Sequence, residues 1–361
     1  MANHTDANRF LRMQRQMLRP KTTAPVDQIV HDLAGVQAQD LRWTPWTVGT
    51  RSRDCTVADV VQAIENRRIV KSWLLRGTLH LVARRDLLWM TDLIAPTIIR
   101  KNTRRYTQLG LSEEHFDKAE HLLRQALLES PALSRSQARQ FFERHGLSAD
   151  GQRLHYLLQR ASLDGVLCHG LEVGREPRFV LRDSDAHPTP PTEERSALIR
   201  KLARRYFTGH GPATKADFLW WSGLPAGPIS AAIAELTDEN ALIVEAGGLY
   251  STPEPSACET SNSLSLLGPF DEYIVGYKDR AVVLDPAWTK RVNAGGGMIK
   301  PTIVHNGRVR GIWSYRDTRE ALLVSLHAFE ERPPLPGELI VSLFSRLSEF
   351  LGRTVRIDDG R

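Results

Sequence analysis

The chain has 361 residues, 41% hydrophobic and 25% charged, a composition typical of soluble globular proteins large enough for more than one core. No apolar run approaches the ~20 residues that cross a bilayer, and the N-terminal MANHTDANRF lacks the apolar region of a signal peptide. Three widely spaced cysteines give neither a zinc-binding spacing nor a disulfide framework. We therefore expect a cytoplasmic protein without a membrane partner.

Positive charge is concentrated in two stretches. The net charge is +6, and residues 67–105 carry ten Lys and Arg against two acids, Asp86 and Asp92. Residues 195–216 carry six basic side chains and no acid. Each cluster alone is compatible with a solvated helix face, but the clusters together favour a polyanionic partner such as nucleic acid.

The first part of the chain predicts helices followed by a hairpin. Thr56 with Asp59 three residues on is typical of a helix N-cap, and Arg76-Gly77 is a turn between two apolar runs. The predicted elements are helices over 6–18, 27–33 and 57–66, a loop at Trp43–Trp46, and strands over 69–74 and 78–82. This is the element order of a winged helix.

The same order occurs twice more at uneven spacing. Apolar residues at helical spacing predict a second and a third set of three helices, each followed by a hairpin. The second set spans 116–127, helices beginning at Ser134 and near Leu154, and strands in 165–171 and 178–181. The third begins at Arg195 and closes with the hairpin 242–251. Polar, Pro-rich linkers are predicted at 183–194 and 252–263.

The last hundred residues change in character. Asn306-Gly307 between two strand-like runs is a strong hairpin signal. The predicted elements are strands over 264–267, 281–284, 298–304, 308–315 and 354–357, and helices over 317–330 and 337–351. The chain is thus predicted as mainly α with small β-hairpins (α+β). Its expected parts are three tandem winged-helix motifs, at 1–110, 111–190 and 191–255, and an α+β region with a long β-hairpin at 256–361.

Common catalytic motifs are absent: there is no GxSxG, HExxH, P-loop or GxGxxG. Gly295-Gly296-Gly297 suits either a close approach to phosphate or, more often, a flexible loop. Asp271, Glu272 and Asp279 could act as acids or bases, but a salt bridge to Arg280 or a helix cap is favoured. His80 faces opposite to Leu79 and Leu81, so it is predicted either on a solvent or DNA face or in a satisfied polar contact.

Winged helices bind DNA through the third helix and the wing. In the first unit the wing carries Lys71, Arg76 and His80, whereas the helix 57–66 has little basic character. A regulator that reads base sequence would more often carry Arg, Asn or Gln along that helix. A non-enzymatic winged-helix regulator is therefore the alternative, which a preference for one undamaged duplex sequence would favour.

Several motifs together resemble one family. The resemblance is to the winged-helix DNA glycosylases of the AlkZ/YcaQ type, and it spans nearly the whole chain. It is carried by Gly35–Gln39, the block Trp73–His80, Gly268–Tyr273, and the stretch Pro301–Trp313. The Gln-x-Gln form is similar to the AlkZ branch, associated with self-resistance to the crosslinking agent azinomycin B, whereas the YcaQ branch carries Asp where Gln39 stands here.

The resemblance implies a C-shaped basic channel and monofunctional cleavage of N-glycosidic bonds of alkylated purines, including unhooking of interstrand crosslinks. It implies that Gln37 and Gln39 are the catalytic pair, in place of the structural alternative of helix C-capping. The expected partner is double-stranded DNA with alkylated or crosslinked purines, bound by a monomer, and no metal or organic cofactor is expected. The side chains expected to contact DNA are Lys71, Arg76, His80, Lys215, Lys300, His305, Asn306, Arg308 and Arg310, with the Asn306-Gly307 hairpin as a probe near the lesion.

Neutral glutamines suit a substrate that is already activated. Alkylation at N7 places positive charge on the purine, which makes it a good leaving group, and the bond can break through an oxocarbenium-like transition state. Two amides could then position one water by hydrogen bonds and dipoles. Because an amide is a poor general base, this chemistry predicts excision of cationic adducts and little action on intact neutral bases.

Overall fold

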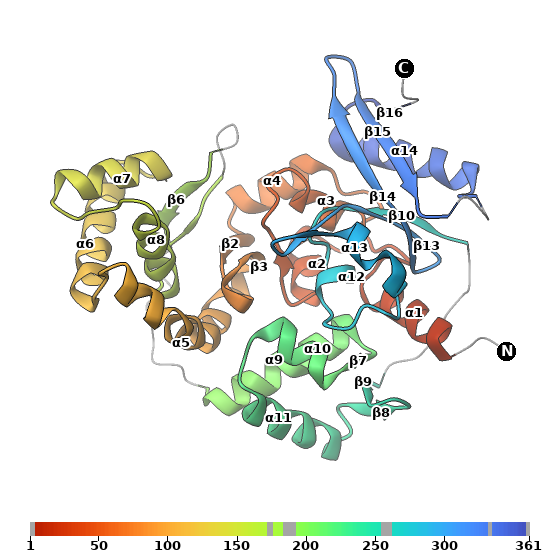
Figure 1. Ribbon diagram of the computed structural model, residues 1–361, viewed down its shortest axis with the longest axis horizontal. Coiled ribbons are helices and arrows are strands. Elements are labelled where there is room, and N and C mark those ends of the chain that lie inside the picture. The colour runs from red at the N-terminus through yellow and green to blue at the C-terminus, as the bar shows by residue number, and fades with distance from the viewer. Residues whose placement is uncertain (1–3, 172–175, 183–192, 254–261, 331–333, 359–361) are drawn as a thin grey trace.

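Helices surround several small sheets in the computed structural model, which describes residues 4–171, 176–182, 193–253, 262–330 and 334–358 (Figure 1). The fold is a mixture of helix and sheet, as the α+β prediction required. Most of the two predicted linkers lies outside the described residues. Within the described part, no helix combines the length and apolar character needed to cross a membrane.

The first part of the chain forms helices around a short hairpin. Its elements are α1 (His4–Arg15), α2 (Val26–Asp32), β1 (Val36–Gln37), α3 (Thr44–Gly49), α4 (Val57–Glu65), β2 (Ile69–Trp73), η1 (Leu75–Gly77), β3 (Leu79–Ala83) and α5 (Arg84–Gln108). The predicted capping box is confirmed, because the Thr56 hydroxyl accepts the Asp59 N–H and the Asp59 carboxylate accepts the Thr56 N–H. The predicted loop at Trp43–Trp46 is wrong: Pro45 starts the helix α3 there, whose Trp46 is buried.

The second part forms a lobe that shares a sheet with the first. Its elements are α6 (Glu113–Glu129), β4 (Leu133–Ser134), α7 (Arg135–Arg144), α8 (Arg153–Leu163), β5 (Leu167–His169) and β6 (Arg178–Leu181). The strand order β1-β3-β2-β5-β6-β4 joins the two hairpins, since Lys71 of β2 pairs with His169 of β5. The lobe of α6, α7 and α8 stands apart from the C-terminal sheet in Figure 1.

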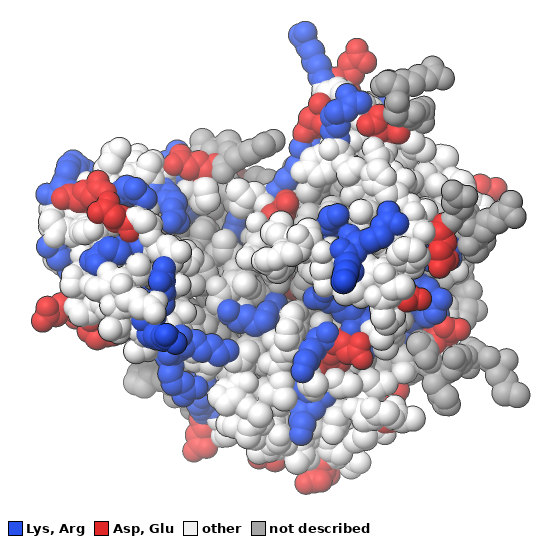
Figure 2. Space-filling view, viewed as in Figure 1, with Lys and Arg blue, Asp and Glu red and all other residues white. Residues whose placement is uncertain are grey.

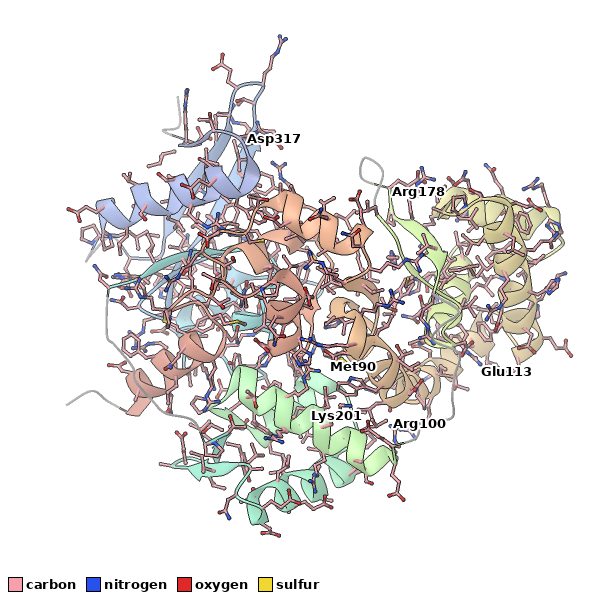
Figure 3. All side chains as sticks on the ribbon, turned by 180° about the vertical axis from the view of Figure 1, so that it is seen from behind. Met90, Arg100, Glu113, Arg178, Lys201 and Asp317 are labelled. Atoms are coloured by element: carbon pink, nitrogen blue, oxygen red, sulfur yellow. The ribbon has the colours of Figure 1, made fainter. Side chains whose placement is uncertain are left out.

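The third part packs behind α5. Its elements are α9 (Arg195–His210), β7 (Ala213–Thr214), α10 (Lys215–Ser222), α11 (Ala226–Asp238), β8 (Ile243–Glu245) and β9 (Leu249–Ser251). From behind, α5 with Met90 lies next to α9 with Lys201 (Figure 3). Arg205 binds the carboxylate of Asp86, and Arg195 donates to the Leu93 carbonyl. Part of the basic excess seen in the sequence therefore holds α9 to α5.

The C-terminal part is a five-stranded sheet, ordered β10-β13-β14-β15-β16, with a separate β11–β12 ribbon. Its elements are β10 (Leu264–Leu267), α12 (Glu272–Val275), η3 (Pro286–Trp288), α13 (Thr289–Val292), β11 (Asn293–Gly295), β12 (Met298–Ile299), β13 (Thr302–His305), β14 (Arg308–Asp317), β15 (Leu322–Ala328), α14 (Gly337–Leu351) and β16 (Val355–Ile357). The hairpin at Asn306-Gly307 is confirmed, with φ of +48° and +74° at the two turn residues.

Two predictions in this region are wrong. Residues 317–330 form no helix: β15 pairs with β14 over seven residues, and Leu322 and Val324 alternate inward as strand residues do. Residues 281–284 form a turn in place of a strand, because Val283 and Leu284 both donate backbone N–H groups to the Arg280 carbonyl. In both segments apolar side chains are buried, but their spacing along the chain was assigned to the wrong type of secondary structure.

Tryptophans tie the first and last parts of the chain together. The indole N–H of Trp46 donates to the Leu266 carbonyl at 2.7 Å, and that of Trp313 donates to the Leu267 carbonyl at 2.9 Å. Trp43 packs edge-on against Trp313 with ring centroids 4.7 Å apart. These contacts fix β10 against α3, and so they bring α12, which follows β10, next to β1.

Candidate active site

A turn at Gly35 delivers the two glutamines. Helix α2 ends at Asp32, and Gly35 has φ +107°, a conformation that glycine adopts cheaply. The chain then enters β1, where Gln37 is opposite His80 of β3. Since side chains alternate along an extended chain, Gln37 and Gln39 share one face while Val36 and Ala38 are buried on the other. The hydrogen bonds of the Gln37 side chain go to Arg76 and Gln39, so capping of α2 is not its role.

Arg76 sets the orientation of both amides. Its Nη2 donates to Gln37 Oε1 at 2.9 Å, and its Nη1 donates to the Trp221 carbonyl at 2.5 Å. The guanidinium also lies over the Trp220 ring, 4.6 Å from its centroid. With Gln37 Oε1 facing Arg76, Gln37 Nε2 faces Gln39 and donates to Gln39 Oε1. The two side chains therefore form one hydrogen-bonded unit with a defined direction.

A buried carboxylate lies behind Gln37. Glu272 Oε1 accepts the Gln37 backbone N–H at 2.9 Å, and Oε2 lies 3.1 Å from Trp221 Nε1 and 3.4 Å from His210 Nε2. Burial raises the pKa of Glu272, but the hydrogen bond with His210 and the charge of Arg76 act in the opposite direction. The net pKa lies below the usual 4.5, so Glu272 is ionised at neutral pH.

The neighbouring acid has a structural role. Asp271 caps α12, accepting the Tyr273 N–H, and it receives two hydrogen bonds of 2.8 Å from the Arg51 guanidinium. The cap prediction is confirmed for Asp271. The alternative salt bridge to Arg280 is not formed, because Arg280 Nη1 donates to Asn293 Oδ1 at 2.9 Å.

The glutamine pair borders a cavity of about 520 Å³. The residues that line it are Gln37, Gln39, Arg76, Thr78, Trp220, Phe270, Val275, Arg280, Asn293, Gly295, Gly296, Gly297, Met298 and Ile299. All three glycines have positive φ, and a Cβ on any of them would meet nothing within 4 Å. The β11–β12 turn is thus an open, unobstructed edge of the cavity that holds the glutamines.

Two of the predicted DNA contacts are interior residues. Lys71 and His80 expose 7% and 1% of their surface. Burial and the charge of Arg76 lower the pKa of His80 to about 4, and its Nδ1 lies 3.0 Å from the Thr78 carbonyl. Of the two alternatives for His80, the structure shows the interior polar contact. The prediction of a solvent or DNA face is wrong, because the His80 side chain is buried.

The other predicted contacts fall into two groups. His305 and Asn306 lie in a turn that does not line the cavity; Asn306 Oδ1 accepts the Ser263 N–H. Lys215, Lys300 and Arg308 are exposed, whereas Arg310 is half-buried, 3.6 Å from Glu330. Lys300 is exposed and directly follows Ile299, which lines the cavity.

Basic side chains serve both the molecular surface (Figure 2) and internal contacts. Figure 2 shows Lys and Arg side chains across the centre of the front face, with most Asp and Glu toward its periphery. A larger cavity, of about 780 Å³, lies along α9, the helix that carries Lys201 in Figure 3. There Arg200 pairs with Glu239 and Arg205 with Asp86, so basic side chains of that cavity serve internal contacts.

Sequence reasoning missed Glu272, Trp220 and Arg280 as neighbours of the glutamines. Gln37 and Glu272 are separated by 235 positions, and no local pattern encodes such a contact. One signal could have linked Glu272 to the glutamines: Gly268–Tyr273 and the glutamine motif both belong to the stretches that carry the family resemblance.

Comparison with known proteins places the chain in a family. The family model for AlkZ-like DNA glycosylases matches residues 30–337, so the chain belongs to this family and is a DNA glycosylase. A curated relative from Streptomyces sahachiroi, an interstrand DNA cross-link repair glycosylase, is 28% identical over 344 residues, covering 90% of this chain and 91% of the relative. The solved structure of Streptomyces sahachiroi DNA glycosylase AlkZ has the same fold, with a TM-score of 0.76 at 24% identity over 99% of this chain and 100% of that one.

Proposed function

We propose that this enzyme hydrolyses the N-glycosidic bond of cationic N7-alkylated purines in duplex DNA and thereby unhooks interstrand crosslinks. One observation carries the proposal: Arg76 and Gln37 orient the amides of Gln37 and Gln39 as one unit at the wall of an open cavity. The name of the Streptomyces sahachiroi relative, with its role in cross-link repair, supports the choice of substrate class.

The geometry leaves acceptor sites for one water. Each amide oxygen has two lone pairs; Gln37 Oε1 uses one for Arg76, and Gln39 Oε1 uses one for Gln37. The remaining lone pairs can accept both protons of a water, which turns the water's own lone pair toward the substrate. Fixed dipoles of this kind act without reorganising during the reaction.

The reaction then balances without a strong base. The bond between C1′ and N9 of the N7-alkylated purine breaks, and its electron pair neutralises the positive charge of the base. Water adds to C1′ of the oxocarbenium-like sugar and loses one proton to solvent. The products are the free base and an abasic site, and an intact neutral purine is a far poorer leaving group.

We further propose that the three repeated element sets, at 1–110, 111–190 and 191–255, are tandem winged helices that line a basic channel for the duplex, ahead of the region 256–361. The exposed Lys215, Lys300 and Arg308 are its proposed phosphate contacts, together with Arg310. The β11–β12 turn, in place of the Asn306-Gly307 turn, is the proposed probe, because it borders the cavity. The protein acts as a monomer in this proposal.

Excision of 7-methylguanine tests the proposal. Gln37→Ala and Gln39→Ala should each release free base from a methylated duplex at least ~100-fold more slowly than wild type, the scale of lost catalytic positioning. Affinity for undamaged duplex and the melting temperature should stay unchanged, since both side chains face the cavity. Gln62→Ala, on the exposed face of α4, is the matched control and should excise normally.

The same assay decides against the proposal in two ways. If wild-type protein binds the methylated duplex and releases no base, the substrate class is wrong. If both cavity variants excise at the rate of Gln62→Ala, the glutamine pair is not the catalytic site.

A further inference from the structure

Positive charge dominates the walls of the glutamine cavity. Arg76 and Arg280 both line it, and both stack on Trp220, with guanidinium carbons 4.6 and 5.8 Å from the ring centroid. Burial, followed by the charge of Arg76, lowers the pKa of Arg280, which shows that the two cations act on each other. Such walls attract phosphate but oppose a reaction whose transition state places positive charge on the sugar.

Glu272 is a buried anion at the backbone of Gln37, a residue that lines this cavity. Its side chain is fully buried, so water screens its charge weakly. Both oxygens are held: Oε1 by the Gln37 N–H, and Oε2 by Trp221. The charge of Glu272 in turn raises the pKa of Arg76, against the lowering that burial causes. The carboxylate is therefore electrostatically coupled to the residue that orients Gln37.

Two elements far apart in the chain converge on Gln37 through these contacts. Trp221 donates its indole N–H to Glu272 and accepts Arg76 through its carbonyl. Arg76 holds the Gln37 side chain, and Glu272 holds the Gln37 backbone. The result is a closed ring of four residues, in which loss of Glu272 frees the main chain of the glutamine strand and leaves Arg76 without a compensating charge.

We propose that Glu272 is a positioning residue for excision: it fixes the Gln37 main chain and supplies the negative charge that favours the cationic sugar. It does not touch the substrate and takes no proton. The proposal rests on the proposed function, since it concerns the same bond cleavage.

Two substitutions separate the two parts of this role. Glu272→Gln keeps length but removes charge, and Glu272→Asp keeps charge but withdraws the acceptor from the Gln37 N–H. Under single-turnover conditions, with protein in saturating excess over duplex containing 7-methylguanine, each variant should lower the excision rate constant roughly 10- to 100-fold, the range seen when partners that orient reactive groups are removed. The dissociation constant for undamaged duplex should stay within about twofold of wild type. Glu272 is buried and supports Gln37, whose replacement is also expected to leave that affinity unchanged.

Asp86→Asn is the matched control. Asp86 is also a buried carboxylate held by an Arg and a His, but it joins α5 to α9 and does not line the glutamine cavity. This variant should excise at the wild-type rate below its melting temperature, which separates a general loss of stability from a loss of positioning.

Each result has a defined meaning. A wild-type excision rate in either Glu272 variant, or a rate loss matched by an equal loss of DNA affinity, overturns the proposal. If Glu272→Gln does not fold, Glu272→Asp alone decides, because it retains the charge beside His210 and Arg76. Failure of the proposed function looks different: wild-type protein itself would then release no base.

Discussion

At the scale of single residues, burial decides which form of a titratable group the fold accepts. His80 is buried and lies near Arg76, so its pKa falls to about 4. His169, beside the buried Lys71, has its pKa lowered by burial to about 3. Both histidines are therefore neutral in the folded protein at pH 7, while in the unfolded chain they take up protons near pH 6.5.

Acid should therefore destabilise the protein through His80. The pKa of His80 is lower in the folded protein than in the unfolded chain. The part of the free energy of unfolding that depends on neutral His80 is therefore fully present above about pH 6.5, and it is lost as pH falls toward 4. A shift of this size corresponds to about 3 kcal/mol. Urea unfolding at pH 7 and pH 4.5 should show a smaller acid loss for His80→Asn than for wild type. His121→Asn, exposed on α6, should keep the wild-type loss; equal losses in all three proteins would contradict the assignment.

At the scale of elements, the β11–β12 ribbon is the part whose role changed most. From the sequence alone, its three glycines are compatible either with a close approach to phosphate or with a flexible loop. In the structure they form a turn with positive φ throughout, at the edge of the glutamine cavity. Arg280 anchors the start of the ribbon through Asn293. The ribbon is thus held at its base and open at its tip.

A bulky side chain in this turn should impair excision without unfolding the protein. Gly296→Val places a β-branched residue at φ +58°, a local strain of about 1–2 kcal/mol that should re-shape the tip. We expect excision of 7-methylguanine to fall roughly 10-fold or more, since small misplacements near the reacting bond are costly. Gly247→Val imposes similar strain at φ +82° in the β8–β9 turn, which does not line the cavity. Equal activity of the two variants would exclude a role for the ribbon.

Local signals explain which elements were predictable. The capping box at Thr56 and the Asn306-Gly307 hairpin depend on residues a few positions apart, and both are confirmed. The strand β15 was predicted as a helix, because its pairing with β14 and β16 is specified by distant residues. The glutamine pair could be predicted from the family resemblance, but its contact with Glu272 could be found only in the structure.

At the scale of the whole molecule, the positive charge has two uses. Arg195 and Arg205 bind α5 internally, whereas Lys and Arg side chains also lie across the front face in Figure 2. The excess counted along the sequence therefore overstates the surface available to DNA. Only the Lys and Arg side chains that remain exposed contribute to DNA binding through release of counterions.

Salt should weaken DNA binding steeply. If about six phosphates are neutralised, affinity for undamaged duplex should fall on the order of 1,000-fold between 50 and 200 mM salt. Replacing both Lys300 and Arg308 by Ala should reduce the slope of log affinity against log salt by about two. Fluorescence anisotropy with a labelled duplex measures both quantities. A salt-independent affinity, or an unchanged slope in the double variant, would contradict phosphate binding at these residues.

The pairing of β2 with β5 limits where the chain could be cut into fragments that fold on their own. Lys71 and His169 join the two hairpins in one sheet, and Trp73, His169 and Phe179 pack together across the junction, with neighbouring centroids 4.8 Å apart. A fragment ending near residue 110 would leave the edge of β2 unpaired, and unpaired strand edges invite aggregation. We therefore expect the described residues of the first two parts to unfold together, because their hairpins share one sheet.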